Sequence, residues 1–153
     1  MTIRVQTEDF DAGAELAAMR VASASVGAVV NFIGQVRDIN DGDTVSTLTL
    51  EHYPGMTERS LEAIEAEAKA RWDIVSSLII HRVGTLQPLD QIVLVAVASA
   101  HRGEAFEACE FIMDYLKVQA PFWKKESTLV GERWVEAKTR DNDAQVRWKS
   151  KNN

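Results

Sequence analysis

The pattern of hydrophobic and polar positions predicts strands and helices mixed along the whole chain. Runs rich in β-branched and aromatic residues predict strands, and apolar residues spaced three or four apart predict helices. The predicted strands cover residues 3–6, 27–37, 45–53, 77–83, 91–99, 122–128 and 133–137, and the predicted helices cover residues 14–21, 57–72 and 103–118. Residues 92–98 are all apolar, so we expect this strand at the centre of the sheet. The pattern predicts an α+β domain with a mixed, mainly antiparallel sheet and helices packed on it.

Turn-forming residues separate these elements. An Asn-, Asp- and Gly-rich segment at 38–43 predicts a loop, and Pro54-Gly55 breaks the strand at 45–53. Thr57 is the predicted N-cap of the helix at 57–72, and Pro121 ends the helix that begins near Gly103. We expect one domain over residues 1–140 and a polar, flexible tail over residues 141–153.

Composition limits what the chain can be. It has 153 residues, of which 46% are hydrophobic, and a domain of this size can bury a core without disulfides or a structural metal. Cys109 is its single cysteine, so an intrachain disulfide and a cysteine-rich metal site are excluded and a reducing, cytoplasmic location is expected. Cys109 lies in the apolar stripe of a helix between Phe106 and Met113, which indicates a buried, unreactive thiol.

The formal net charge is −6, which argues against general affinity for nucleic acid. Any site for an anion must therefore be a local cluster of basic side chains. No signal-peptide core or membrane-length apolar run is present, and the glycine loops that usually bind nucleotides are absent.

One candidate cluster is His101-Arg102, where a buried strand leads into a helix. The free N–H groups and the helix dipole at such a junction favour an anion. The alternative is that His101 only caps the helix and Arg102 is a solvated surface charge.

A second cluster is formed by Lys117 and Lys124, on either side of Pro121. A sharp reversal at Pro121 would bring both ammonium groups to one cleft; alternatively, Lys117 only complements the helix dipole and Phe122 and Trp123 belong to the core. Arg37 is a third candidate, because it ends a buried strand beside a loop.

His52 and His81 lie within strand patterns with no carboxylate or cysteine at metal-ligand spacing. A structural role is favoured for both.

Six segments together resemble the large, catalytic subunit of molybdopterin synthase. They are residues 32–37, 50–57, 99–102, 111–117, 120–126 and 133–137, and they include the unusual run Glu51-His52-Tyr53-Pro54-Gly55-Met56. The resemblance covers most of residues 27–137, and it is weak in the first twenty-odd residues and in the tail.

The resemblance implies an α/β-hammerhead-like fold and a sulfurtransferase of molybdenum cofactor biosynthesis. It implies a homodimer that binds one small ubiquitin-like subunit at each end, making a heterotetramer. The C-terminal Gly-Gly thiocarboxylate of that partner supplies sulfur, and cyclic pyranopterin monophosphate (precursor Z) receives two sulfurs to give the molybdopterin dithiolene. The resemblance implies no cofactor and no metal. It also implies no binding to nucleic acid or to a membrane.

Carried over position by position, the family's substrate pocket falls on Gln35, Val36, Arg37, His101, Arg102, Lys117, Lys124, Lys125 and Glu126. Lys117 and Lys124 are the catalytic candidates: Lys117 as the proton donor or acceptor near the thiocarboxylate, and Lys124 to stabilise developing negative charge. Family members often carry a lysine where this chain has Gln35, so an ionic contact is lost there while a backbone contact is still available. Lys138 and Arg140 are candidates for reaching the pocket of the opposite protomer.

The mechanism requires Arg37, His101, Lys117 and Lys124 to share one hollow. The competing hypothesis is a non-catalytic module that binds a phosphorylated ligand or a partner's tail in the same basic cleft. A single-stranded RNA platform built on Phe122 and Trp123 is a further alternative, which the acidic charge disfavours.

Overall fold

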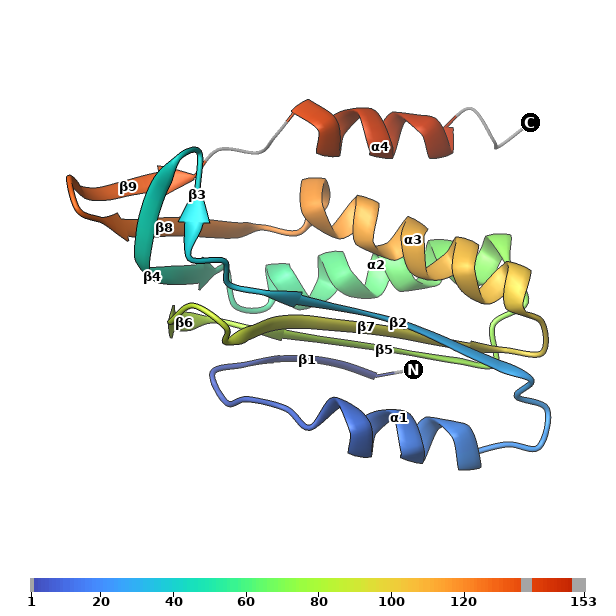
Figure 1. Cartoon of the computed structure of the whole chain (residues 1–153). Helices are drawn as coiled ribbons and strands as arrows, with labels where there is room; N and C mark the ends of the chain where they lie inside the picture. Colours follow the sequence, from blue (N-terminus) through green and yellow to red (C-terminus); the bar gives the residue numbers. More distant parts are fainter. Residues whose placement is uncertain (1, 136–138, 150–153) are drawn as a thin grey trace.

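The described part of the chain forms two sheets and four helices, which are arranged in layers (Figure 1). The computed structural model describes residues 2–135 and 139–149. The first sheet has the order β1 (Thr2–Gln6), β5 (Ser76–Arg82), β7 (Gln91–Ser99) and β2 (Ala28–Gln35). Only the β1–β5 pair is parallel; β5–β7 and β7–β2 are antiparallel. The expected α+β class with a mainly antiparallel sheet is confirmed.

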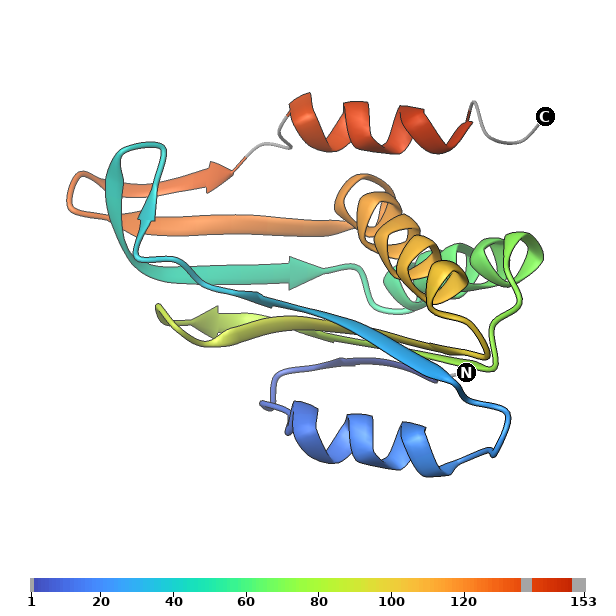
Figure 2. The same cartoon turned by 45° about the vertical axis from the view of Figure 1, so that its right-hand side comes forward.

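The second sheet extends to one side of the first (Figure 2). Its order is β3 (Ile39–Asn40), β4 (Asp43–His52), β8 (Phe122–Thr128) and β9 (Gly131–Val135), and β6 (Gly84–Leu86) also pairs with β4. The predicted loop at 38–43 therefore contains the short strand β3, which makes a hairpin with β4. The predicted strand at 133–137 begins two residues earlier, and residues 136 and 137 lie outside the described part of the chain.

Helices cover both faces of the first sheet. α1 (Ala12–Val21) lies on one face, and α2 (Met56–Arg71) and α3 (Arg102–Gln119) lie on the other (Figure 1). Alternate residues of β7 enter different cores: Val93, Val95 and Val97 pack with α2 and α3, whereas Leu94 and Ala96 pack towards α1. Burial on both faces explains why β7 is continuously apolar, as expected for a central strand.

The buried stripe of α3 differs slightly from the prediction. Ala105, Ala108, Cys109 and Ile112 are buried, whereas Phe106 is 61% exposed. Cys109 and Met113 of the predicted stripe are buried as expected, so the prediction is wrong only for Phe106, whose place is taken by Ala105.

The expected flexible tail is wrong for residues 141–149. They belong to α4 (Thr139–Lys149), which packs on α3. Trp148 is 1% exposed and makes edge contacts with Trp72 and Phe111 at centroid distances of 5.5 and 5.7 Å. Its indole N–H also donates to Asp114 at 2.6 Å. One large apolar side chain anchors an otherwise polar segment, which a reading of composition alone does not reveal.

No helix in residues 2–135 or 139–149 is long and apolar enough to cross a membrane.

Candidate active site

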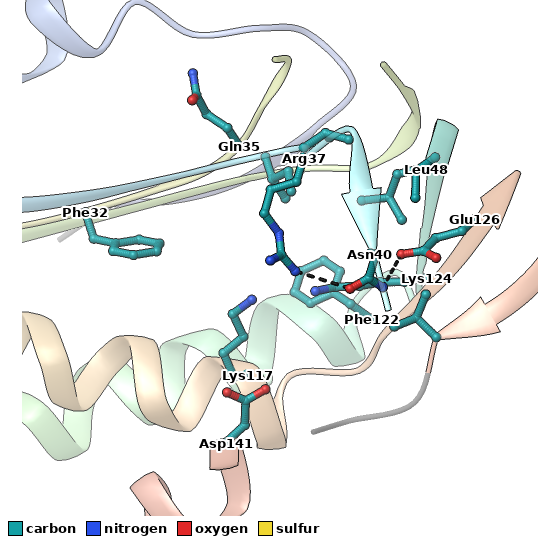
Figure 3. A pocket seen from close by; sticks show the side chains of 14 residues that line it. Phe32, Gln35, Arg37, Asn40, Leu48, Lys117, Phe122, Lys124, Glu126 and Asp141 are labelled. Atoms are coloured by element: carbon teal, nitrogen blue, oxygen red, sulfur yellow. Dashed lines mark hydrogen bonds between the residues drawn. The ribbon is translucent and has the colours of Figure 1, made fainter. Parts of the chain in front are cut away.

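A hollow of about 390 Å³ opens between the two sheets and the C-terminal end of α3 (Figure 3). We call it the cationic hollow, because Arg37, Lys117 and Lys124 all line it. An adjoining cavity of about 430 Å³ shares these three residues and adds His81. The structure therefore brings together three of the four basic residues that the mechanism requires.

The turn at Pro121 places Lys117 and Lys124 at the same hollow. Lys117 lies in the last turn of α3, the helix ends at Gln119, and β8 begins at Phe122. Phe122 then pairs with His52 of β4, so the strand runs directly away from the helix end. The predicted reversal is wrong, because β8 continues in roughly the direction of α3 (Figure 1), but the two lysines still reach one hollow.

A buried hydroxyl fastens this turn to α2. The Thr57 hydroxyl donates to the carbonyl of Pro121 at 3.2 Å and accepts the N–H of Tyr53 at 3.0 Å. Thr57 is therefore not the N-cap that was predicted. That position is taken by Gly55, whose φ of 83° suits glycine and whose N–H donates to Glu58 at 2.6 Å.

Arg37 reaches the hollow from the segment that follows β2. Its guanidinium donates to the side-chain oxygen of Asn40 at 3.2 Å, and Asn40 donates to Glu126 at 2.5 Å. Arg133 binds the other oxygen of Glu126 at 3.1 Å. In Figure 3, Arg37 and Lys117 point towards each other across the hollow, and Asn40 lies between Arg37 and Glu126.

The charges of the lining favour an anionic ligand. Three cations face two carboxylates, those of Glu126 and Asp141. Glu126 is buried and already bonded by Asn40 and Arg133, so much of its charge is compensated outside the hollow. A negatively charged ligand therefore gains favourable interactions here although the whole chain has a net charge of −6.

His81 forms part of the wall of the adjoining cavity and is only 3% exposed. Its ring stacks on Phe122 with centroids 3.7 Å apart and planes 14° from parallel. Burial lowers the pKa of His81 to about 3, against the opposing effect of the Arg82 carbonyl, and Lys124 and Lys117 lower it further. Nδ1 lies 2.8 Å from that carbonyl, which can only accept, so the neutral ring carries its proton on Nδ1.

His101 and Arg102 are not at the hollow within one chain. They stand at the N-terminal end of α3, whereas Lys117 is in its last turn. A helix of this length spans about 25 Å, which is too far for the two ends to share a small ligand. The expectation that one chain gathers all four basic residues is wrong for His101, and Arg102 lies apart with it; their part in substrate binding stays a prediction.

The other predicted site residues divide between the hollow and its surroundings. Gln35, Val36 and Glu126 line the hollow. The Gln35 side chain points away from Arg37 and Lys117 (Figure 3) and donates to the carbonyl of Leu89 at 3.5 Å. Val36 is buried and held through its backbone by Asp90 and Leu89.

Lys125 does not line the hollow, because adjacent strand residues face opposite sides of a sheet. It forms an ion pair with Glu132 at 3.6 Å and lies over the ring of Trp134. Lys138 and the side chain of Arg140 lie outside the described residues.

Cys109 is buried, as predicted, and it does not line the hollow. Burial raises the pKa of its thiol to about 12, with a smaller contribution from the charge of Glu110. Cys109 is therefore no nucleophile at physiological pH. Among the residues that the structure describes, no group of three or more His, Cys, Asp or Glu side chains could hold a metal ion.

The site residues proposed from sequence did not include Phe32, Asn40, Phe122 and Asp141, which line the hollow, or His81, which lines the adjoining cavity. Asn40 stood in a segment interpreted as a loop, and His81 was assigned a structural role. The sequence signal that could have pointed to His81 was a histidine within an apolar strand. A polar ring buried in such a strand requires a specific partner.

Comparisons with known proteins agree with this arrangement. The family model described as "MoaE protein" matches residues 5–119. A molybdopterin synthase catalytic subunit from Ralstonia nicotianae is 65% identical over 147 residues, covering 96% of this chain and 84% of the relative. The corresponding protein from Pseudomonas aeruginosa is 55% identical and covers 97% and 99%.

Solved structures show the same similarity in three dimensions. The molybdopterin biosynthesis MoaE protein from Burkholderia ambifaria is 56% identical, with a TM-score of 0.83 and 97% of each chain covered. Molybdopterin synthase from Staphylococcus aureus is 34% identical, with a TM-score of 0.80 over 87% of this chain and 96% of its own. From this extent of matching sequence and structure, the chain belongs to the MoaE family, the family of molybdopterin synthase catalytic subunits.

Proposed function

We propose that this chain transfers sulfur from the thiocarboxylate of a small ubiquitin-like subunit to cyclic pyranopterin monophosphate, forming the molybdopterin dithiolene. The observation that carries the proposal is the meeting of Arg37, Lys117 and Lys124 in one hollow of an acidic protein. Both reactants are anions, and a local excess of positive charge is what they require. The buried, protonated Cys109 supports an external source of sulfur and fits a cytoplasmic location.

The three cations take different roles. Arg37 binds the cyclic phosphate, and each charge-assisted hydrogen bond contributes about 1.5–3 kcal/mol. Lys117 acts near the thiocarboxylate as proton donor or acceptor, and Lys124 stabilises the negative charge that develops during transfer. The neutral ring of His81 and the apolar side chains of Phe32 and Phe122 offer a surface for the flat pterin.

The partners follow from the resemblance. The chain forms a homodimer, and the C-terminal tail of one small subunit enters each hollow. His101 and Arg102 are exposed at the far end of α3, so in this dimer they contact substrate only if a second copy carries them to the hollow.

The central experiment mixes the purified chain, the thiocarboxylated small subunit and precursor Z, and measures dithiolene product. Lys117→Ala and Lys124→Ala are each expected to lower the rate by about 100-fold or more, the scale of losing a proton-transfer or charge-stabilising group. Lys69→Ala is the matched control, because Lys69 is also an exposed lysine in the last turn of a helix but lies on α2, away from the hollow. The Lys69→Ala variant should form product at the wild-type rate.

The outcomes separate the alternatives. Near-normal turnover by Lys117→Ala or Lys124→Ala would remove that residue's catalytic role, and weaker substrate binding alone would make it a binding residue. If wild type bound precursor Z but formed no product, the non-catalytic binding module would be the better description.

The placement of Arg102 is tested in the same assay with mixed dimers. Lys117→Ala and Arg102→Ala are each inactive in this scheme, but a dimer of one with the other contains one intact hollow. Random mixing should restore about a quarter of wild-type activity, because about half the dimers are mixed and each has one of two sites intact. No recovery in mixtures that contain such dimers would place Arg102 outside the site.

A further inference from the structure

Asn40 is a buried polar residue at the edge of the cationic hollow, contributed by the short strand β3. It is 8% exposed, and its side chain bridges two charged residues of the site. Its oxygen accepts from Arg37 at 3.2 Å, and its nitrogen donates to Glu126 at 2.5 Å (Figure 3). An amide is well suited to this bridge, because one end donates and the other accepts.

The two partners fix the orientation of the amide. Turned over, it would place its NH₂ group against the guanidinium of Arg37 and its oxygen against the carboxylate of Glu126, so both contacts would become repulsive. An aspartate could accept from Arg37 but could not donate to Glu126. The same hairpin carries Asp38, Asp41 and Asp43, yet the bridging position holds the amide.

Arg133 of β9 holds the other end of the bridge. It donates to the backbone carbonyl of Asn40 at 2.9 Å, to Glu126 at 3.1 Å and to Asp43 at 2.5 Å. Both carboxylate oxygens of Glu126 are therefore bonded, one by Asn40 and one by Arg133. A carboxylate bonded in this way competes less for the cations of the hollow.

The amide stands between the guanidinium of Arg37 and the carboxylate of Glu126, so its loss would leave these opposite charges without the group that separates them. A direct ion pair between Arg37 and Glu126 would draw the guanidinium towards β8 and cancel charge that an anionic substrate needs.

We infer that Asn40 is a positioning residue that holds Arg37 towards the substrate phosphate and keeps Glu126 from capturing it. The inference rests on the proposed function for the identity of the substrate. It assigns to Asn40 an effect on substrate binding, with little effect on sulfur transfer.

The first test compares Asn40→Ala with wild type in the product assay. The KM for precursor Z should rise about tenfold, which corresponds to about 1.4 kcal/mol, while kcat stays within about twofold. Thr44→Ala is the control, because it alters an exposed side chain of the same hairpin outside the hollow and should leave both constants unchanged. An unchanged KM, or a loss confined to kcat, overturns the inference.

A pH profile of Asn40→Asp distinguishes positioning from a general loss of structure. A protonated aspartate can donate to Glu126 and accept from Arg37 as the amide does, whereas the ionised form is repelled by Glu126. The ratio of its KM to that of wild type should therefore fall as the pH is lowered from 8 towards the ordinary pKa of an aspartate, about 4, while the ratio for Asn40→Ala stays high; parallel profiles for both variants over this range overturn the inference. The charged residues facing this position are Arg37, Asp43, Lys117, Lys124, Glu126, Arg133 and Asp141.

A measurement without substrate separates this inference from the proposed function. In ¹⁵N-labelled protein, the rotational mobility of the Arg37 guanidinium should differ between wild type, where it bonds the Asn40 amide, and Asn40→Ala, where Glu126 captures it. Equal mobility in the two proteins overturns the positioning role even if wild type makes no product. Absence of product from wild type together with a clear difference in mobility would instead reject the proposed function alone.

Discussion

The buried His81 makes the stability of this protein depend on pH in a predictable direction. In the folded chain its pKa is lowered to about 3, chiefly by burial, whereas its ordinary value is 6.5. Below pH 6.5 the unfolded chain takes up a proton that the folded chain excludes, so acid favours unfolding. The stabilisation is complete above pH 6.5 and is lost progressively as the pH falls towards 3.

The magnitude follows from the difference between the folded and unfolded pKa values. Each pH unit below the unfolded value costs about 1.4 kcal/mol, so His81 alone should lower the free energy of unfolding by about 2 kcal/mol at pH 5. His81→Phe is the matched variant, because it keeps an aromatic ring against Phe122 but cannot titrate. Its loss of the Nδ1 bond to Arg82 costs stability at every pH and cancels when two pH values are compared.

The assay is urea unfolding of both proteins at pH 7.5 and pH 5, at one protein concentration. Wild type should lose about 2 kcal/mol more than His81→Phe between these pH values, since all other titrating groups are common to both. A difference below about 0.5 kcal/mol would mean that His81 is not held neutral in the folded protein, because a neutral, buried ring requires the larger value. Independently, ¹⁵N shifts of His81 in the folded protein should stay those of the neutral ring from pH 8 to pH 5.

Two other substitutions test the core. Trp148→Ala should lower the free energy of unfolding by about 3–5 kcal/mol, because it removes a fully buried ring between Trp72 and Phe111; a loss below about 1 kcal/mol in urea unfolding would mean that α4 is not anchored there. Cys109→Ser should cost about 1–3 kcal/mol by placing a hydroxyl in the core while sulfur transfer continues; loss of turnover in a folded variant would contradict its assignment as a structural residue.

Most of the secondary structure could be predicted from sequence, because it depends on local patterns. The apolar run at 92–98 marked the central strand β7, and the spacing of apolar residues in 103–118 marked α3 to within one residue at each end. Both patterns agree with the structure. A strand buried on both faces is continuously apolar, and a helix buried on one face has apolar residues three or four apart. The prediction of a flexible tail was wrong because its packing depends on one residue, Trp148. A single apolar residue produces no periodic pattern in the sequence.

The two candidate lysines of the hollow could be proposed from sequence because they are close in the chain. Only a short turn at Pro121 separates Lys117 from Lys124, so local geometry nearly determines their meeting. Strand alternation should have excluded Lys125 by the same local argument, and it does so in the structure.

The remaining parts of the site were decided by tertiary structure. Asn40 and Glu126 are 86 residues apart, and their contact depends on the pairing of β3 with β4 and of β4 with β8. His81 meets Phe122 only because the fold brings the end of β5 in the first sheet to the start of β8 in the second. Local patterns along the chain are enough to predict which elements form and which residues carry charge, since both are local properties. Only the fold determined which of those charges face one another, because that depends on how separate strands and helices pack.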